Sequence, residues 1–187
     1  GGANHAVTPA YADEVLAHFS AGDILLLQNE ISTGPHILRR AAEMGLKIWF
    51  NPSPMDSGAL ACDLSLVSVF LLNEIEGEQL AGTAEPEAIL SRMAEKYPQA
   101  AVVLTLGAAG AWYSKGQTRV FCPAEKAEAA DTTAAGDTFT GYFLRGMLDG
   151  RAPLEALRLA AKAAAIAVSR PGASPSIPRF SEVECSL

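Results

Sequence analysis

The chain has 187 residues, of which 49% are hydrophobic and 19% charged, and its formal net charge is −7 at pH 7. This balance is typical of a globular protein with a substantial core, and it excludes an intrinsically disordered chain. A general nucleic-acid binder needs a basic surface, so the acidic charge argues against that class, whereas it is compatible with a nucleotide site built from backbone amides.

The first half of the chain alternates helical patterns with short apolar runs. Thr8 and Pro9 form a typical helix start, with Thr8 as the N-cap and Pro9 at the first helical position. Helical spacing covers residues 11–19, 34–43, 74–81 and 86–97. The apolar runs, which predict strands buried on both faces, cover residues 23–28, 47–50, 66–72 and 101–106.

The second half contains a predicted hairpin and two strong helices. Residues 111–114 and 118–122 flank the turn Lys115-Gly116 and predict paired strands. Helical patterns follow at residues 136–148 and 153–169. Strands separated by helices predict an α/β fold, in which one doubly wound, mostly parallel sheet carries helices on both faces. We expect the whole chain to form a single portion of such a fold.

Ligands of doubly wound folds bind beyond the carboxyl ends of the strands. Four polar side chains follow the predicted strands at these ends and are therefore candidate ligand contacts: Glu30, Asn51, Asn73 and Thr105.

Membrane and secretory patterns are lacking in the sequence. No apolar run reaches the roughly 18 residues that a membrane-spanning helix needs, and the N-terminal residues do not have the layout of a signal peptide. Cys62, Cys122 and Cys185 are widely spaced and form no paired or metal-binding motif. We therefore expect a cytoplasmic protein with free thiols and no membrane or nucleic-acid partner.

The segment around Asp137 concentrates the candidate chemistry. Small residues, Ala134-Ala135-Gly136, precede Asp137 at the start of a strong helix pattern. They let the backbone approach a ligand closely, and the free amides of the helix N-terminus attract an anion. A carboxylate there can take a proton from a substrate hydroxyl. Taken by itself, however, the pattern is more typical of Asp137 or Thr138 as a simple helix cap.

Several segments together resemble the ribokinase family. Asp131–Gly141, reading DTTAAGDTFTG, is similar to the C-terminal signature DTxGAGD, with Ala134 at the first glycine of GAGD. Four more segments resemble family motifs in the family's order, and the resemblance covers about residues 2–179. These segments are Gln28-Asn29-Glu30, the N-x-x-E segment Asn73–Glu76, the turn Leu104–Gly107 followed by Gly110, and Ala167–Ser176.

The resemblance implies a carbohydrate kinase that transfers a phosphoryl group from ATP to the primary hydroxyl of a small sugar, with ribose the leading candidate and ribose 5-phosphate the product. Asp137 would be the catalytic base, and Glu30 would bind sugar hydroxyls beside it. The backbone amides of Ala134–Asp137, which include Ala135 and Gly136, would form the anion hole.

The resemblance also implies the ligands of ATP and of two cations. ATP would be bound by Asn73, Thr105, Gly107, Gly110 and Gly136. Glu76 would act on Mg²⁺ through water, as suits a hard cation that keeps its hydration shell. K⁺ would be held by the Asp131 carboxylate, by the carbonyls of Thr133, Ala167, Arg170 and Gly172, and by the Ser176 hydroxyl.

Each of these motifs has an ordinary structural interpretation when it stands alone. Asn73 is then typical of a turn, Glu76 of a solvated helix acid, and Pro171-Gly172 of a helix stop. The resemblance further implies that N-terminal strands, a β-sheet lid and a sugar-binding segment belong before residue 2, and that the full-length protein can form a homodimer. Two alternatives stay open: a kinase for another sugar or a nucleoside in the same family, or an inactive truncated fragment that binds ATP. No dinucleotide-binding G-x-G-x-x-G and no P-loop is present.

Overall fold

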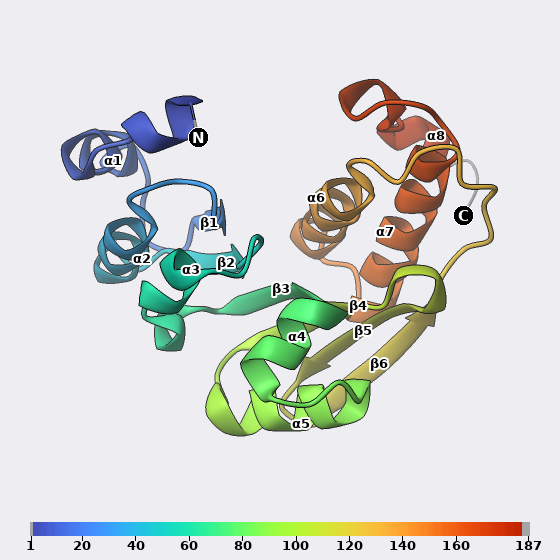
Figure 1. The fold of residues 1–187 in the computed structure, drawn as a ribbon, viewed down its shortest axis with the longest axis horizontal. Helices are drawn as coiled ribbons and strands as arrows, with labels where there is room; N and C mark the ends of the chain where they lie inside the picture. Colours follow the sequence, from blue (N-terminus) through green and yellow to red (C-terminus); the bar gives the residue numbers. More distant parts are fainter. Residues whose placement is uncertain (1, 185–187) are drawn as a thin grey trace. The chain divides into compact units, whose positions relative to one another are not determined.

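The computed structural model (Figure 1) describes residues 2–184. Six strands are hydrogen-bonded in sequence order, from β1 to β6. The chain divides into two compact units, one up to Leu104 and the other from Thr105 onward. A sheet that is mostly parallel and is joined by helices confirms the predicted fold class.

The first unit contains the parallel part of the sheet. Its strands are β1 (Ile24–Gln28), β2 (Lys47–Asn51), β3 (Val69–Asn73) and β4 (Ala101–Thr105). Its helices are η1 (Gly2–Ala6), α1 (Pro9–Leu16), α2 (Gly34–Glu43), α3 (Ser57–Ala61), η2 (Leu64–Leu66), α4 (Glu74–Ala81) and α5 (Pro86–Lys96). Strand β1 pairs with β2 in parallel, with Ile24 opposite Lys47, and β2 pairs with β3 in parallel.

Burial in this unit increases away from β1. The central strand residues Phe50, Phe70 and Leu104 are almost completely buried. In β1, by contrast, Leu26 is 39% exposed. The continuous apolar run of β1 therefore predicted more burial than the described residues supply.

The second unit contains a hairpin and two long helices. Its elements are η3 (Gly107–Ala109), β5 (Gly110–Lys115), β6 (Thr118–Pro123), α6 (Ala135–Leu148), α7 (Pro153–Val168), η4 (Ser174–Ser176) and α8 (Phe180–Glu184). Strands β5 and β6 are antiparallel, which confirms the predicted hairpin, although Lys115 pairs with Thr118 and so belongs to β5 and not to the turn. Helices α6 and α7 approach closely at Gly146, where an added Cβ would lie 2.9 Å from the Ala156 Cβ. Glycine at this position is therefore needed for the packing of the two helices.

Most predicted elements form, and the differences have local causes. Thr8 caps α1, because its hydroxyl accepts a hydrogen bond from the Tyr11 amide at 3.2 Å. Strand β3 begins at Val69, later than predicted, since Asp63 caps a 3-10 turn over the preceding residues. The short helix α3 was not predicted, although Asp56 caps it by accepting a hydrogen bond from the Gly58 amide at 2.7 Å.

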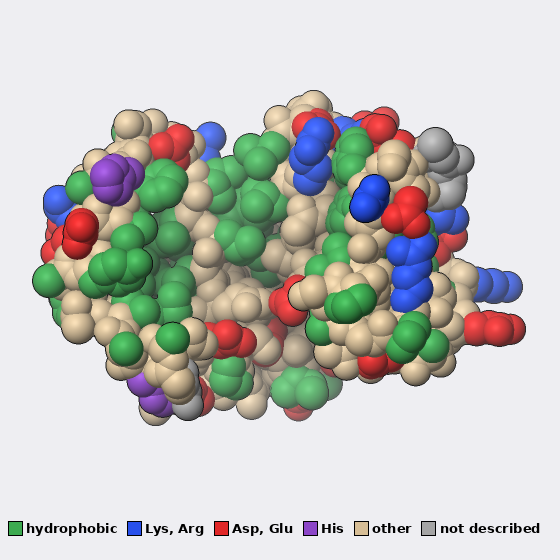
Figure 2. All heavy atoms as spheres, turned by 90° about the horizontal axis from the view of Figure 1, so that it is seen from above, with side chains coloured by type: hydrophobic (Ala, Val, Ile, Leu, Met, Phe, Trp, Pro, Cys, Tyr) green, Lys and Arg blue, Asp and Glu red, His purple; other side chains and the backbone are tan. Residues whose placement is uncertain are grey.

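Other sequence expectations concern surfaces and thiols. No helix among the described residues is long and apolar enough to cross a membrane. Cys62 and Cys122 are free and buried, and Cys185 lies outside the described residues. On the face drawn in Figure 2, basic side chains are scattered and several lie beside acidic ones, so this face carries no continuous basic surface in the part of the chain that is described.

Candidate functional site

The second unit encloses a cavity of about 370 Å³. This volume lies within the range of pockets for small molecules and cofactors. Most of the lining is apolar, and the polar side chains are few. The residues that line the cavity are Thr105, Gly107, Ala108, Gly110, Ala124, Glu125, Ala127, Ala129, Thr132, Ala135, Gly136, Phe139, Ala161, Ala164, Ala165 and Val168.

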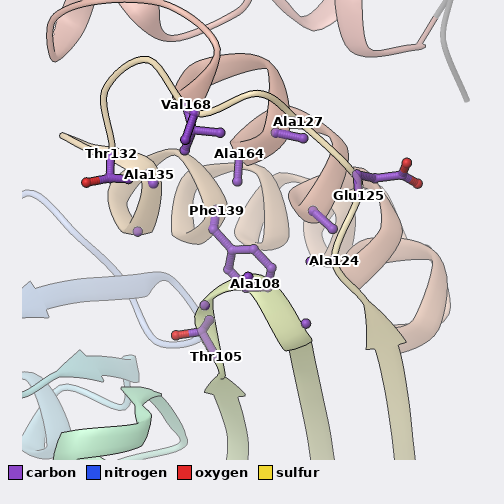
Figure 3. Close-up of a pocket in the computed structure, with 16 residues that line it drawn as sticks. Thr105, Ala108, Ala124, Glu125, Ala127, Thr132, Ala135, Phe139, Ala164 and Val168 are labelled. Carbon is purple, nitrogen blue, oxygen red and sulfur yellow. The ribbon is translucent and has the colours of Figure 1, made fainter.

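The glycine turn after β4 forms one wall of the cavity (Figure 3). The Leu106 amide donates to the Gly110 carbonyl at 2.8 Å, which closes the turn. Gly107 has φ +52° and Gly110 has φ +131°, conformations that residues with a side chain rarely adopt. The glycines therefore allow a tight turn whose backbone faces the cavity, with Thr105 at its start.

A loop over residues 124–130 forms a second wall. The Ala124 amide donates to the Ala109 carbonyl, and the Ala130 amide donates to the Val168 carbonyl at 2.8 Å, so both ends of the loop are fixed. In Figure 3, the side chain of Glu125 points away from the other labelled residues. The carboxylate thus leaves the apolar character of the cavity unchanged.

The N-terminus of α6 closes the cavity on a third side. Ala134 precedes the helix in the left-handed conformation, with φ +61°, and makes no side-chain cap hydrogen bond. The helix begins at Ala135, so Asp137 lies within its first turn and is exposed; neither Asp137 nor Thr138 is the cap. Amides of a first helical turn point outward and form an anion site with the helix dipole.

The helix turn leaves open space beside Gly136. An ideal Cβ built on Gly136 meets no atom within 4 Å, and Gly136 lines the cavity, so a ligand atom can approach the backbone here. The Thr138 hydroxyl is buried and has no hydrogen-bond partner among the described residues. Because Thr138 is not among the residues that line the cavity, a bound water is the partner that suits this hydroxyl.

The Asp131 carboxylate connects two segments that lie 41 residues apart. Its Oδ2 accepts from the Gly172 amide and its Oδ1 from the Thr133 amide, each at 2.9 Å. Hydrogen bonds from the Thr133 hydroxyl and amide and from the Gly172 amide lower the pKa of Asp131 to about 2. Asp131 is therefore ionised at neutral pH and brings the predicted cation-binding segments together.

The remaining residues of that predicted set lie in the same region. The Ala167 carbonyl already accepts from the Arg170 amide at 3.1 Å. The Ser176 hydroxyl is buried and donates to the Ala173 carbonyl at 2.6 Å. The Ala167 carbonyl also accepts from the Ser169 amide, so this turn is held by several backbone hydrogen bonds.

In the first unit, Asn73 and Glu76 form a capping box at the start of α4. The Asn73 Oδ1 accepts from the Glu76 amide at 2.9 Å, while the Glu76 carboxylate accepts from the Asn73 amide and from its Nδ2, both at 3.0 Å. Glu76 is 4% exposed. It is therefore not the solvated acid that the motif suggests when it stands alone, and its first role is to begin the helix.

Glu30 follows β1 and is held by a residue from the start of the chain. The Asn4 Nδ2 donates to the Glu30 Oε2 at 3.4 Å, and the Ser32 hydroxyl donates to the Asn4 carbonyl at 3.4 Å. Asn51 accepts from the Ser53 amide at 3.0 Å through its Oδ1 and stabilises the turn after β2. Of these strand-end residues, Asn51 thus has a local structural role.

Residues 2–179 match the pfkB family of carbohydrate kinases. The chain belongs to this family. A ribokinase from Lactococcus lactis is 32% identical over 188 residues, covering 100% of this chain and 61% of the relative. A crystal structure of ribokinase from Thermotoga maritima is 31% identical, with a TM-score of 0.78, and covers 97% of this chain and 61% of that protein. The structure of Arabidopsis thaliana ribokinase complexed with ribose and ATP has 29% identity and a TM-score of 0.74, covering 87% and 55%.

The pfkB-family chain thus spans about 61% of the length of the relatives that it matches. Four residues predicted to bind ATP share the cavity: Thr105, Gly107, Gly110 and Gly136. Asn73 lies in the other unit. Among His, Cys, Asp and Glu, no group of three or more that could hold a metal occurs in residues 2–184.

One wall of the cavity in the second unit was not predicted from the sequence. Ala161, Ala164, Ala165 and Val168 line it from α7. Their spacing of three, four and seven residues places them on one face of the helix, which is the signal that could have identified them. Phe139, on α6, also lines the cavity.

Proposed function

We propose that the chain is the nucleotide-binding, catalytic portion of a sugar kinase. It takes the γ-phosphoryl group of ATP and transfers it to the primary hydroxyl of a small sugar, with ribose as the leading substrate. The observation that carries this proposal is the cavity of the second unit, which combines an alanine-lined apolar wall with the N-terminus of α6.

Each part of the cavity suits one part of a nucleotide. The adenine and ribose occupy the space between the glycine turn and the alanines of α7, where apolar walls replace water around the base. The phosphates lie at the N-terminus of α6. The open space in front of Gly136 admits an oxygen where a methyl group would block it, and the first-turn amides donate to that oxygen.

Asp137 acts as the general base. Its carboxylate accepts the proton of the sugar hydroxyl as that oxygen attacks the γ-phosphorus, and ADP leaves on the opposite side. The backbone amides of Ala134–Asp137 stabilise the charge that develops on the phosphoryl oxygens. Among them, the Ala135 amide also donates to the Thr132 carbonyl at 3.3 Å, so it contributes as a shared donor. Because Asp137 follows Gly136 directly, the base and the anion hole are positioned by the same helix turn.

Two cations support this site. Mg²⁺, when bound, would neutralise phosphate charge, and Glu76, whose carboxylate accepts hydrogen bonds from Asn73, would act on it through water. K⁺ fits the second unit, where the ionised Asp131 lies beside carbonyl-rich turns; backbone carbonyls are the ligands that replace the hydration shell of this ion. Its proposed ligands are Asp131, Thr133, Ala167, Arg170, Gly172 and Ser176.

The choice of ribose is supported by the ribokinase names of the relatives and by the ribose and ATP bound to the Arabidopsis protein. Glu30 is the proposed contact to sugar hydroxyls. A kinase for another small sugar or a nucleoside in the same family is the second candidate, since the chain matches only 61% of the length of the ribokinase relative.

The test compares Asp137→Asn with the unchanged chain. Transfer of labelled γ-phosphate from ATP to ribose is measured together with ADP affinity by calorimetry. We expect the substitution to lower transfer by about 10²- to 10⁴-fold, the usual contribution of a general base, while ADP affinity stays within about twofold. Measurable transfer at equal rates in both proteins would remove Asp137 as the base, and no transfer by the unchanged chain would favour the inactive ATP-binding fragment. Absence of ADP binding to the unchanged chain would contradict the proposed nucleotide site.

A further inference from the structure

An ion pair joins the proposed cation segment to the C-terminal helix. The Arg170 Nη2 lies 2.6 Å from the Glu182 Oε1. Arg170 stands in the turn after α7, two residues before Gly172, whose amide donates to Asp131. The pair therefore acts on the stretch of backbone whose carbonyls belong to the proposed K⁺ ligands.

Glu182 is itself held in place. Its Oε2 accepts from the Arg179 amide at 2.7 Å, and its own amide donates to the Arg179 carbonyl at 3.0 Å. The carboxylate thus has one oxygen for its own helix turn and one for Arg170. A carboxylate fixed in this way restricts the guanidinium that it binds to one geometry.

The helix that carries Glu182 is anchored in the core of the second unit. Val183, in α8, is completely buried with Leu159 and Ala163 of α7. Phe180 stacks on Tyr142 of α6 at a centroid distance of 6.2 Å, and the Tyr142 hydroxyl donates to the Pro178 carbonyl at 2.7 Å. Helix α8 therefore rests on both helices that line the cavity.

We propose that the Arg170–Glu182 ion pair is a positioning device for the cation segment, and that it holds the backbone of Arg170–Gly172 in the conformation that binds K⁺. The inference rests on the proposed function, because it assumes the K⁺ site. Three contacts then fix this turn: the Arg170 amide on the Ala167 carbonyl, the Gly172 amide on Asp131, and the Arg170 side chain on Glu182. The last of these is made by the side chains of an ion pair, so it can be removed while the two contacts of the backbone amides remain.

Neither Arg170 nor Glu182 touches the ion through its side chain in this proposal, so both are positioning residues. An ion pair whose side chains are about 40% exposed contributes little to overall stability. Its loss should consequently change the affinity for K⁺ much more than the melting temperature without K⁺. This difference separates a positioning role from a general structural one.

The experiment measures the melting temperature of the chain as KCl replaces choline chloride at constant ionic strength, which keeps electrostatic screening unchanged. A cation that binds only the folded chain raises the melting temperature with its concentration. The variants are Glu182→Gln, which keeps an acceptor for the Arg179 amide, Arg170→Ala and Arg170→Lys.

The matched control is Glu184→Gln. It removes an ion pair of the same helix, Glu184 with Arg151 at 3.2 Å, which does not involve the cation segment. We expect Glu182→Gln and Arg170→Ala to raise the K⁺ dissociation constant, fitted to the rise of the melting temperature with K⁺ concentration, by about fivefold, in line with the upper range of exposed ion pairs. Arg170→Lys should restore part of the affinity, and Glu184→Gln should match the unchanged chain.

An unchanged K⁺ dissociation constant in both Glu182→Gln and Arg170→Ala would overturn the positioning role. If K⁺ does not stabilise the unchanged chain relative to choline, the K⁺ site and the positioning role both fail. ADP binding measured in parallel shows whether the nucleotide part of the proposed function survives that result.

Discussion

Replacing Gly136 with Ala should move stability and nucleotide affinity in opposite directions. Gly136 lies in the first turn of α6 with an ordinary negative φ, and an added Cβ meets no protein atom within 4 Å. The fold therefore accepts the methyl group. Since alanine loses less backbone entropy than glycine on folding, Gly136→Ala should stabilise the chain by about 0.4–1 kcal/mol.

The same methyl group would occupy the space that we assign to the phosphate oxygens. Extra methyl groups in filled sites cost about 1–3 kcal/mol, which corresponds to a loss of roughly fivefold to more than a hundredfold in ADP affinity. Urea denaturation measures the first effect and calorimetric titration with ADP the second.

Gly141→Ala is the matched control for this prediction. Gly141 lies in the same helix, also has no atom within 4 Å of an added Cβ, and is not among the cavity-lining residues. It should gain similar stability and keep its ADP affinity. An ADP affinity that is the same in Gly136→Ala as in the unchanged chain would refute the placement of the phosphates at this helix turn.

Three further predictions concern the hairpin, the cation segment and the edge strand. Gly110→Ala should destabilise the chain by roughly 2–6 kcal/mol, because its φ of +131° suits only glycine and the Cβ would collide with the Cys122 carbonyl. The control Gly116→Ala has open space at the hairpin turn and should cost only about 1–2 kcal/mol. Urea denaturation measures both losses of stability. Because the pKa of Asp131 is lowered, its contribution to stability is complete above its ordinary pKa of 3.8 and is lost as the pH falls toward about 2. In acid unfolding, the stability of Asp131→Asn should therefore fall less over this pH range than that of the unchanged chain. Because Leu26 is exposed on β1, at the edge of the sheet, we expect the chain to self-associate through this strand and Leu26→Lys to reduce that association. Size-exclusion chromatography measures both proteins, and a monomer in both would contradict association through β1.

The strands and long helices could be predicted because their patterns are decided locally. The run Ile24–Leu27 and the hairpin around Lys115-Gly116 depend on apolar periodicity and turn chemistry, and both form as expected. The predicted start of strand β3 was placed too far toward the N-terminus because Leu66 is apolar. In the structure, the Asp63 side chain caps the 3-10 turn that contains Leu66, and β3 begins after this turn. Apolar periodicity alone cannot distinguish a strand residue from an apolar residue in a capped turn.

Some residues of the candidate site could likewise be predicted from local sequence patterns, and others could not. Gly107, Gly110 and Gly136, which line one cavity, could be predicted as ligand contacts because glycine at a turn or helix start allows the backbone to approach a ligand closely. The alanines of α7 share one helix face, which is a weaker signal, since alanine is a common residue of any helix and the same spacing also fits helix packing. The capping box of Asn73 and Glu76 is readable from N-x-x-E, yet only the burial of Glu76 shows that it is more than a solvated acid.

The most direct test of the nucleotide site is a calorimetric titration of ADP into the chain and into Ala164→Phe. Ala164 is half-buried and lines the cavity from α7, so a phenyl ring at this position would fill the space assigned to the nucleotide. The account predicts one ADP bound per unchanged chain and no measurable binding to Ala164→Phe, with both proteins folded by circular dichroism. Equal ADP affinity in the two proteins, or no binding to the unchanged chain, would contradict it.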